Sequence, residues 1–273
     1  MMPVSQMRRA LSAAFVACAV SLSAAPTASA QNMIDMVDLS TDEFTKAVMS
    51  RADIEAAIAK LPAGEKLDLY AKPLNGLDLS KMDLRRTNLQ QARLMGANLS
   101  GANLEGVVLD QVWALKANFS GANLQKANMF GTQLVGANLD GADLRGARLA
   151  GDFSKASMIK ANLEGANLSA DEANQSMGLM RGVFSSANLE GANLKGANLA
   201  RALLEYASLK DANLTDVSLR GSEVAGADFT GADVTGVDFI DADVNSAKIG
   251  AMKNLAAAKN LDKSKNLEKA YRK

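Results

Sequence analysis

The chain has 273 residues, with 30 basic and 30 acidic side chains, a single cysteine and no histidine. The balanced charge gives no whole-molecule argument for binding nucleic acid or for imitating it. The missing histidine and the lone cysteine exclude Cys–His nucleophile–base pairs, histidine metal ligands and zinc sites.

Residues 1–30 differ in composition from the rest of the chain. Arg8 and Arg9 precede a short apolar run, and small residues at 28–30 come directly before Gln31. This pattern is typical of a secretory signal peptide, and the run is shorter than the about 20 residues that a membrane-spanning helix needs. We therefore expect export, to the periplasm in a Gram-negative bacterium and otherwise by secretion.

Cleavage after Ala30 would remove the only cysteine, Cys18, so the exported chain could form no disulfide. It would leave 28 basic and 30 acidic residues. A lipoprotein signal cleaved before Cys18 is the less favoured alternative, because Phe15 stands where that processing usually requires leucine. We expect no transmembrane segment in the remaining chain.

Residues 31–66 are predicted to form a helical cap ahead of the repeats. The stretch STDE at 40–43 fits a capping box, and apolar residues from Phe44 onward follow at helical spacing. A second helix is expected from about Ala52 to Lys60, ending before Pro62. Both helices would cover unpaired backbone groups at one end of the fold.

A five-residue repeat dominates residues 67–251. The triplet of Ala, then Asn or Asp, then Leu, Phe, Met or Val occurs sixteen times, as in Ala97-Asn98-Leu99. In a helix, five residues at about 100° each would turn the leucine by about 140° per copy, so no apolar stripe forms. In a straight strand, an odd period sends alternate leucines to opposite faces. The chain must therefore turn once per repeat, with Gly at the corner, Ala and Leu inside, and Asn or Asp outside.

These residues resemble the pentapeptide repeat family. The resemblance implies an all-β solenoid, a right-handed quadrilateral β-helix of four repeats per coil, here with a short α-helical N-terminal cap. About nine coils at a strand separation of about 4.8 Å would make a rod about 43 Å long. Each interior leucine would contribute about 2 kcal/mol, so the stack of coils stabilises the fold.

The repeat breaks twice. One residue is missing at a corner near Ala150 or Gly151. Residues 169–178 lack the motif and are predicted to be a surface loop between a first part, 67–168, and a second part, 179–251. Such a loop could carry a binding function or be an insertion without one.

Residues 252–273 form a basic tail. From Lys248 to Lys273 there are eight basic and two acidic residues, whereas Asp216 to Asp243 holds seven acidic and one basic. We favour a tail that folds over the acidic last coil and caps it, and the alternative is an arm that projects toward an anionic surface or partner. Asn-Leu pairs recur in the tail every six residues, a spacing for which the sequence alone gives no conformation.

The outward carboxylates do not predict a catalytic or metal-binding site. Five of them lie five residues apart, on successive sides of the rod, and do not converge: Glu223, Asp228, Asp233, Asp238 and Asp243. We therefore expect no enzyme activity, no catalytic residue, no metal site and no cofactor. Some family members inhibit type II topoisomerases by resembling duplex DNA, which requires a strongly acidic surface and access to the chromosome. We expect this chain to have neither, so that role is disfavoured. An ice-binding face would require outward threonine ladders, and the Asn and Ser columns here are not such ladders.

An apolar cluster on the outer surface is the candidate protein-binding site. At twenty residues per coil, Met95, Leu115 and Val135 share one outward column, with Trp113 beside Leu115 and Phe130 in the equivalent slot of the neighbouring side. Patches centred on tryptophan are typical interface anchors. The alternative is structural, because Ala114 replaces the usual leucine and a local shift could turn Trp113 or Leu115 inward.

The sequence thus predicts a non-enzymatic exported scaffold or protein-binding module. The rival interpretation is an inhibitor or regulator of a specific envelope enzyme. We expect a protein partner of unknown identity and no nucleic acid, and an end-to-end dimer is a less favoured alternative. Resemblance to a family predicts the fold far better than the function.

Overall fold

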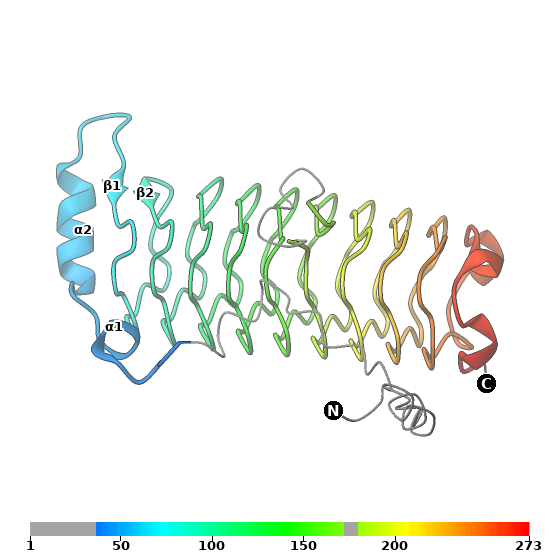
Figure 1. Ribbon diagram of the computed structural model, residues 1–273. Helices are drawn as coiled ribbons and strands as arrows, with labels where there is room; N and C mark the ends of the chain where they lie inside the picture. The colour runs from blue at the N-terminus through cyan, green and yellow to red at the C-terminus, as the bar shows by residue number, and fades with distance from the viewer. Residues whose placement is uncertain (1–36, 172–179, 273) are drawn as a thin grey trace, which may run out of the picture.

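The computed structural model describes residues 37–171 and 180–272. They form a rod of stacked coils, with one helix along the N-terminal end and short turns of helix at the C-terminal end (Figure 1). Neighbouring coils are joined by parallel bridges, mostly between residues 20 positions apart, such as Asn98 with Asn118 and Asn103 with Asn123. Bridges at Val108 and Trp113 complete the same coil, so each coil has four sides. The chain is a β-solenoid.

Regular strand is scarce in the described residues. They contain two strands of two residues each, β1 (Leu67–Asp68) and β2 (Thr87–Asn88), which pair in parallel. The chain turns directly after each central residue, since the Ala102 N–H donates to the Leu99 carbonyl at 3.0 Å and Gly101 takes φ 64°. This left-handed corner limits most sides of the coils to a single bridging residue.

The recurring asparagine holds both the turn and the neighbouring coil. The Oδ1 of Asn98 accepts from the Ser100 N–H and from Asn118 Nδ2, both at 3.2 Å. The Nδ2 of Asn98 donates to Asp78 Oδ1 at 3.1 Å. Asn or Asp is therefore favoured in this slot because its side chain closes a turn and extends a ladder.

The core is a continuous column of small and large apolar side chains. Ala97 and Leu99 are both 0% exposed, and their counterparts in the other repeats are similarly buried. The rings of Phe153 and Phe184 stack at 4.9 Å between centroids and 5° between planes. The core thus stays continuous across the break in the sequence pattern.

The structure confirms the missing corner residue. Trp113 bridges to Gln133, 20 positions on, whereas Gln133 bridges to Asp152, 19 positions on. A Cβ added to Gly151 would lie 2.4 Å from Thr132 Oγ1, so the shortened corner requires glycine.

The second break is an insertion at one corner. Asp152 bridges to Val183, 31 positions on, and the regular spacing resumes at Phe184. Most of the predicted loop at 169–178 lies outside the described residues, as does Leu179, where the second part of the repeats is predicted to begin. The base of the insertion is closed by a hydrogen bond of 2.8 Å from the Asp171 N–H to the Met180 carbonyl.

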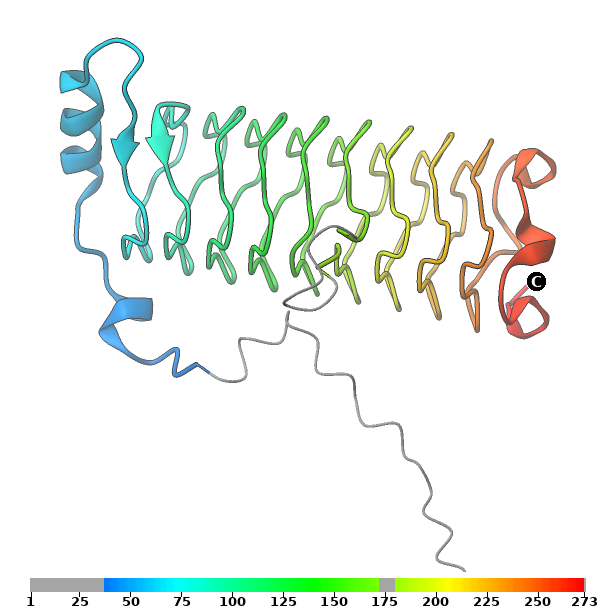
Figure 2. The same cartoon turned by 45° about the horizontal axis from the view of Figure 1, so that its top comes forward.

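Two helices precede the coils. α1 (Asp42–Thr45) lies beside the first coils, and α2 (Arg51–Lys60) runs along the end of the rod (Figure 2). Ile54 of α2 is 0% exposed, and Arg51 Nη1 donates to the Ser80 carbonyl at 3.1 Å. α2 therefore covers the first coil.

The predicted capping box at 40–43 is wrong. Thr41 is the N-cap of α1 but makes no side-chain capping bond, because the helix is only four residues long. The capping box belongs to α2, where Ser50 Oγ accepts from the Asp53 N–H at 3.2 Å and Asp53 Oδ2 accepts from the Ser50 N–H at 2.8 Å.

Residues 252–272, here named the C-terminal coil, lie on the rod and do not project from it. Lys253, Lys259 and Lys265 bridge in parallel to Asp233, Asp238 and Asp243. Each side of this coil has six residues: the bridging lysine, an asparagine at φ 54–58°, a 3₁₀ turn and a small residue. The turns are η3 (Leu255–Ala257), η4 (Leu261–Lys263) and η5 (Leu267–Lys269). The Asn-Leu spacing of six thus builds a wider corner than the spacing of five.

Candidate protein-interaction site

Trp113 is the docking point of α1. It occupies an outward bridging position between Arg93 and Gln133, while its neighbour Ala114 is 0% exposed inside the rod. The ring of Phe44 meets the Trp113 ring edge-on, at 5.4 Å between centroids and 60° between planes. Trp113 is consequently only half-exposed, and it does not turn inward to replace the missing leucine.

Charges and backbone bonds fix this contact. Glu43 pairs with Arg93, whose guanidinium lies 5.5 Å from the Phe44 ring centroid and donates to the Ala71 carbonyl at 2.7 Å. Desolvation by burial lowers the pKa of Arg93 below its usual value. Asn75 Nδ2 donates to the Glu43 carbonyl at 2.9 Å, so the rod holds both the side chains and the backbone of α1.

The apolar column consists of Met95, Leu115 and Val135, three half-exposed side chains on successive coils. Their spacing follows the coils, because the Gly96 N–H donates to the Leu115 carbonyl at 2.9 Å and the Lys116 N–H to the Val135 carbonyl at 3.1 Å. The column lies on the same side of the rod as Trp113. The structure therefore places four of the five predicted site residues together.

Phe130 lies apart from them, in a charged cluster on the neighbouring side. Its ring is 5.0 Å from the Arg148 guanidinium, which pairs with Asp171 at 2.5 Å. Its N–H donates to Asp110 Oδ1 at 3.1 Å. Burial raises the pKa of Asp110 and outweighs the Phe130 N–H and the charge of Arg148, which act in the opposite direction.

Gln133 is the residue that bridges to Trp113 from the next coil, and its side chain is buried. It is 0% exposed, and neither side-chain amide atom makes a hydrogen bond with the protein. The Gln133 side chain is therefore not part of the exposed surface beside Trp113.

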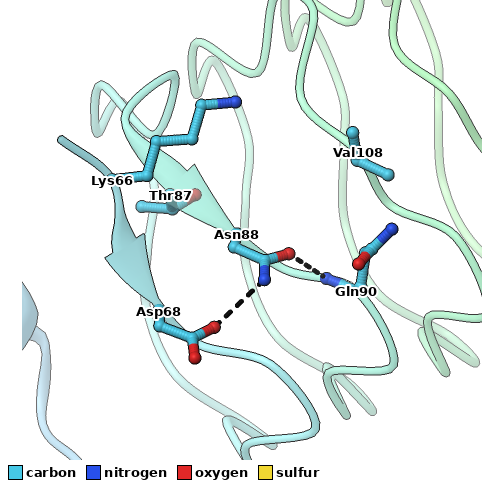
Figure 3. Close-up of a pocket in the computed structure, with 6 residues that line it drawn as sticks. All are labelled: Lys66, Asp68, Thr87, Asn88, Gln90 and Val108. Atoms are coloured by element: carbon cyan, nitrogen blue, oxygen red, sulfur yellow. Dashed lines mark hydrogen bonds between the residues drawn. The ribbon is translucent and has the colours of Figure 1, made fainter. Parts of the chain in front are cut away.

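Two surface hollows accompany these residues. One, of about 400 Å³, lies between α1 and the rod and is lined mainly by Val37, Glu43, Phe44, Gln111 and Trp113. The other, of about 370 Å³, is polar and runs from Lys66 to Val108 (Figure 3). In it Asn88 Nδ2 donates to Asp68 Oδ1 at 3.0 Å, and the Gln90 N–H donates to Asn88 Oδ1 at 3.2 Å. The first of these bonds joins two neighbouring coils, and the second closes a turn within one coil.

Across residues 37–171 and 180–272, no three candidate ligand side chains come together to hold a metal ion. Within these ranges no helix is both long and apolar enough to cross a bilayer.

The sequence does not predict the contact between Phe44 and Trp113. It predicts that the helix with Phe44 seals the first coil, whereas α1 packs on Trp113, because a four-residue helix gives no periodic signal for the side of the rod on which it lies. Aromatic residues make up 4% of the chain, and their tendency to pack in pairs is the sequence signal for this contact.

Comparisons with known proteins bear on the fold. A family model described as pentapeptide repeats matches residues 74–111, 116–151, 183–221 and 212–249 in eight copies. The gap between the first two matches holds Trp113, Ala114 and Leu115, the residues that depart most from the repeat. None of the curated proteins matches this chain.

Several solved structures are similar. HetL, a pentapeptide repeat protein involved in heterocyst differentiation regulation in the cyanobacterium Nostoc sp. strain PCC 7120, is 24% identical over 82% of this chain and 94% of its own, with a TM-score of 0.45. QnrB1, a plasmid-mediated fluoroquinolone resistance protein, is 15% identical over 74% and 92%, with a TM-score of 0.51. A pentapeptide repeat protein of the Arabidopsis thaliana thylakoid lumen is 28% identical over 49% and 68%, with a TM-score of 0.22.

The likeness to QnrB1 supports the solenoid fold alone, because the identity is low. The family matches extend over more than half of the chain and fall on the coils whose Ala, Asn and Leu positions the structure explains. The chain therefore belongs to the pentapeptide repeat family.

Proposed function

We propose that the protein is an exported, non-enzymatic scaffold that binds another protein through one outer side of its rod. The observation that carries this proposal is the apolar column of Met95, Leu115 and Val135. Elsewhere on the same side, the equivalent slots include Glu205 and Asn245. A contiguous apolar strip beside an aromatic pair is typical of protein interfaces.

The Phe44–Trp113 pair supports this assignment. It holds α1 against the rod and forms one border of the hollow of about 400 Å³ between α1 and the rod. A fixed aromatic border loses little side-chain entropy when a partner binds. We expect the right-handed quadrilateral winding of the family to present this side as one flat strip.

The proposal of a non-enzymatic role rests on the structural hydrogen bonds that the outward carboxylates make. Asp228 accepts a hydrogen bond from Lys248 at 2.9 Å, and Asp238 accepts one from Arg220 at 2.8 Å. These carboxylates hold neighbouring coils together.

The proposal of export rests on residues 1–30, which have the pattern of a signal peptide. N-terminal sequencing of the exported chain is expected to begin at Gln31.

A photo-crosslinking experiment in the exported fraction tests the binding side. A crosslinking residue placed at Leu115 is expected to trap a partner, and the double variant Leu115→Ser, Val135→Ser is expected to weaken capture by at least about tenfold, because two buried aliphatic contacts are lost. The matched control, Glu205→Ser with Asn245→Ser, changes the same kind of slot on the same side and is expected to leave capture unchanged.

Trp113 fluorescence and the thermal transition check that each variant is folded, since Trp113 is the only tryptophan. Equal capture by wild type and both folded variants would exclude the column as the interface. Capture of one enzyme in a one-to-one complex would favour the rival role, a regulator of a specific envelope enzyme, over a scaffold with several partners.

A further inference from the structure

The C-terminal coil differs from the other coils in charge as well as in geometry. It carries six basic and two acidic side chains between residues 252 and 272. All six basic side chains are exposed: Lys253, Lys259, Lys263, Lys265, Lys269 and Arg272. They come from three sides of the coil and from its end, and they are named the basic rim here.

The acidic coil beneath does not hold these cations in direct contact. Its carboxylates accept instead from asparagine amides: Asp233 from Asn254 at 3.0 Å, Asp238 from Asn260 at 2.8 Å and Asp243 from Asn266 at 2.9 Å. Lys253 pairs with Asp211 at 3.6 Å, and the ion pairs among residues 37–171 and 180–272 include none of the other five. The asparagines thus provide hydrogen bonds to the three carboxylates. Most of the basic side chains of the rim are therefore left without an ion pair within the described residues and can contact a partner.

Exposed apolar side chains lie within the same coil. Tyr271 is 59% exposed and Leu255 is 39% exposed, and they are two of the five large hydrophobic residues that are exposed in the described part of the chain. Lysines next to an exposed tyrosine and leucine are the combination that binds at an anionic lipid–water interface. In water alone, this exposure of apolar area brings no stability.

We propose that the C-terminal coil docks the rod, end first, on a bilayer that contains anionic phospholipid. The lysine rim would face the lipid phosphates, and Leu255 and Tyr271 would enter the headgroup region. A second copy of the chain is disfavoured as the occupant, because two basic rims would repel each other. A purely polyanionic partner would use the lysines but would offer the leucine no apolar surroundings.

This inference goes beyond the protein-binding proposal and does not depend on it. The apolar column of Met95, Leu115 and Val135 lies on early coils, whereas the basic rim belongs to the last described coil. A rod standing on its C-terminal coil would therefore keep the column away from the lipid surface.

Vesicle cosedimentation tests the proposal with the chain that begins at Gln31, which lacks the apolar run of residues 1–30. We expect binding to vesicles of phosphatidylglycerol and phosphatidylcholine, and none to pure phosphatidylcholine. Binding should weaken steeply as salt rises from 0.1 to 1 M, where the screening length falls from about 10 to about 3 Å.

A pair of charge-matched variants locates the site. Lys259→Gln, Lys263→Gln and Lys265→Gln together should reduce partitioning by at least about tenfold, since each basic residue near an anionic surface strengthens binding several-fold. The control replaces three exposed lysines of the middle coils, Lys126→Gln, Lys155→Gln and Lys160→Gln, and changes the net charge equally. It should bind as the wild type does.

Each remaining outcome decides against the proposal. Equal loss in both triple variants would show that net charge, and not the C-terminal coil, governs binding. No binding to anionic vesicles, together with tight binding of a DNA duplex through the same three lysines, would assign a nucleic acid as the occupant. Unchanged partitioning of a folded Leu255→Ser, Tyr271→Ser variant would exclude the lipid interface.

Discussion

The pentapeptide coils and the C-terminal coil keep the same ladder but turn their corners differently. In the pentapeptide coils the left-handed residue comes after the central leucine, as Gly101 does at φ 64°. In the C-terminal coil it comes before the leucine, as Asn260 does at φ 54°, and η4 then completes the corner. The ladder is preserved, since Asp238 still bridges to Lys259. One extra residue per side therefore changes the corner without changing the stacking.

Leucine residues that follow an asparagine are buried to different extents in the two regions. Leu194 of the pentapeptide coils is 0% exposed, whereas Leu261 packs only partly against the core and Leu255 is 39% exposed. Moving the left-handed position from two residues after the leucine to one residue before it moves the leucine from the interior to the rim. A repeated Asn-Leu pair therefore does not by itself indicate a buried leucine.

The largest expected effect tests this difference in burial. Leu194→Ala should lower the free energy of unfolding by about 2–5 kcal/mol, because it leaves a cavity inside the stack. Leu261→Ala should cost about 1 kcal/mol, because less apolar area is lost. Chemical denaturation followed by circular dichroism measures both. Equal costs would show that the C-terminal coil is packed as tightly as the body.

The second prediction concerns the left-handed asparagines. Asn260→Ala removes the hydrogen bond to Asp238 and puts alanine, which tolerates the left-handed region less well than asparagine, at φ 54°, so it should destabilise the C-terminal coil by about 2–3 kcal/mol. Asn260→Gly keeps the backbone conformation and should cost about 1 kcal/mol less. Hydrogen exchange of residues 252–272 measures this local stability. If alanine and glycine prove equivalent, the left-handed corner is not what holds the coil.

The third prediction contrasts two carboxylates. Burial by itself would raise the pKa of Asp228, but hydrogen bonds from Thr230 and Lys248 outweigh it and lower that pKa to about 2. A carboxylate with a lowered folded pKa stabilises fully above its unfolded value, near 3.8, and loses that contribution as the pH falls toward 2. The attachment of Lys248 should therefore weaken between about pH 5 and pH 2.

Asp110 of the pentapeptide coils should behave in the opposite way. Its pKa is raised by burial, so its protonated form is favoured in the fold and its contribution is lost as the pH rises through that pKa. Hydrogen exchange at both places across this pH range, with Asp228→Asn and Asp110→Asn as controls, measures the two trends. The same pH dependence at both sites would contradict the assigned causes.

The sequence predicted the architecture because the five-residue period constrains the backbone in every copy. Ala97 and Leu99 inside and Asn98 outside follow from that period alone, as does the corner near Gly151. The fold class could therefore be argued without coordinates. Hydrogen bonds across coils, such as Asn118 to Asn98, follow once the period of twenty residues is known.

Contacts between unlike elements could not be predicted in this way. The packing of Phe44 on Trp113 depends on where one short helix lies, and no period encodes it. The conformation of Asn260 was equally hidden, because three copies of a six-residue unit are too few to show which residue turns left. The sequence does contain a chemical signal for these asparagines. Three of them, spaced six residues apart, can each bond one of three aspartates spaced five residues apart on the coil beneath: Asp233, Asp238 and Asp243.

The smallest expected effect tests the corners themselves with one substitution at two places. Lys116 occupies a pentapeptide corner at φ 56°, where a side chain costs about 1 kcal/mol, so Lys116→Gly should stabilise the rod by up to about that amount. Lys263 ends η4 outside the left-handed region, so Lys263→Gly should destabilise by about 0.5–1 kcal/mol through lost backbone entropy. Both lysines are exposed, which makes the pair comparable in thermal unfolding. Shifts of opposite sign would establish that the two regions place their left-handed residue differently, and shifts of the same sign would contradict it.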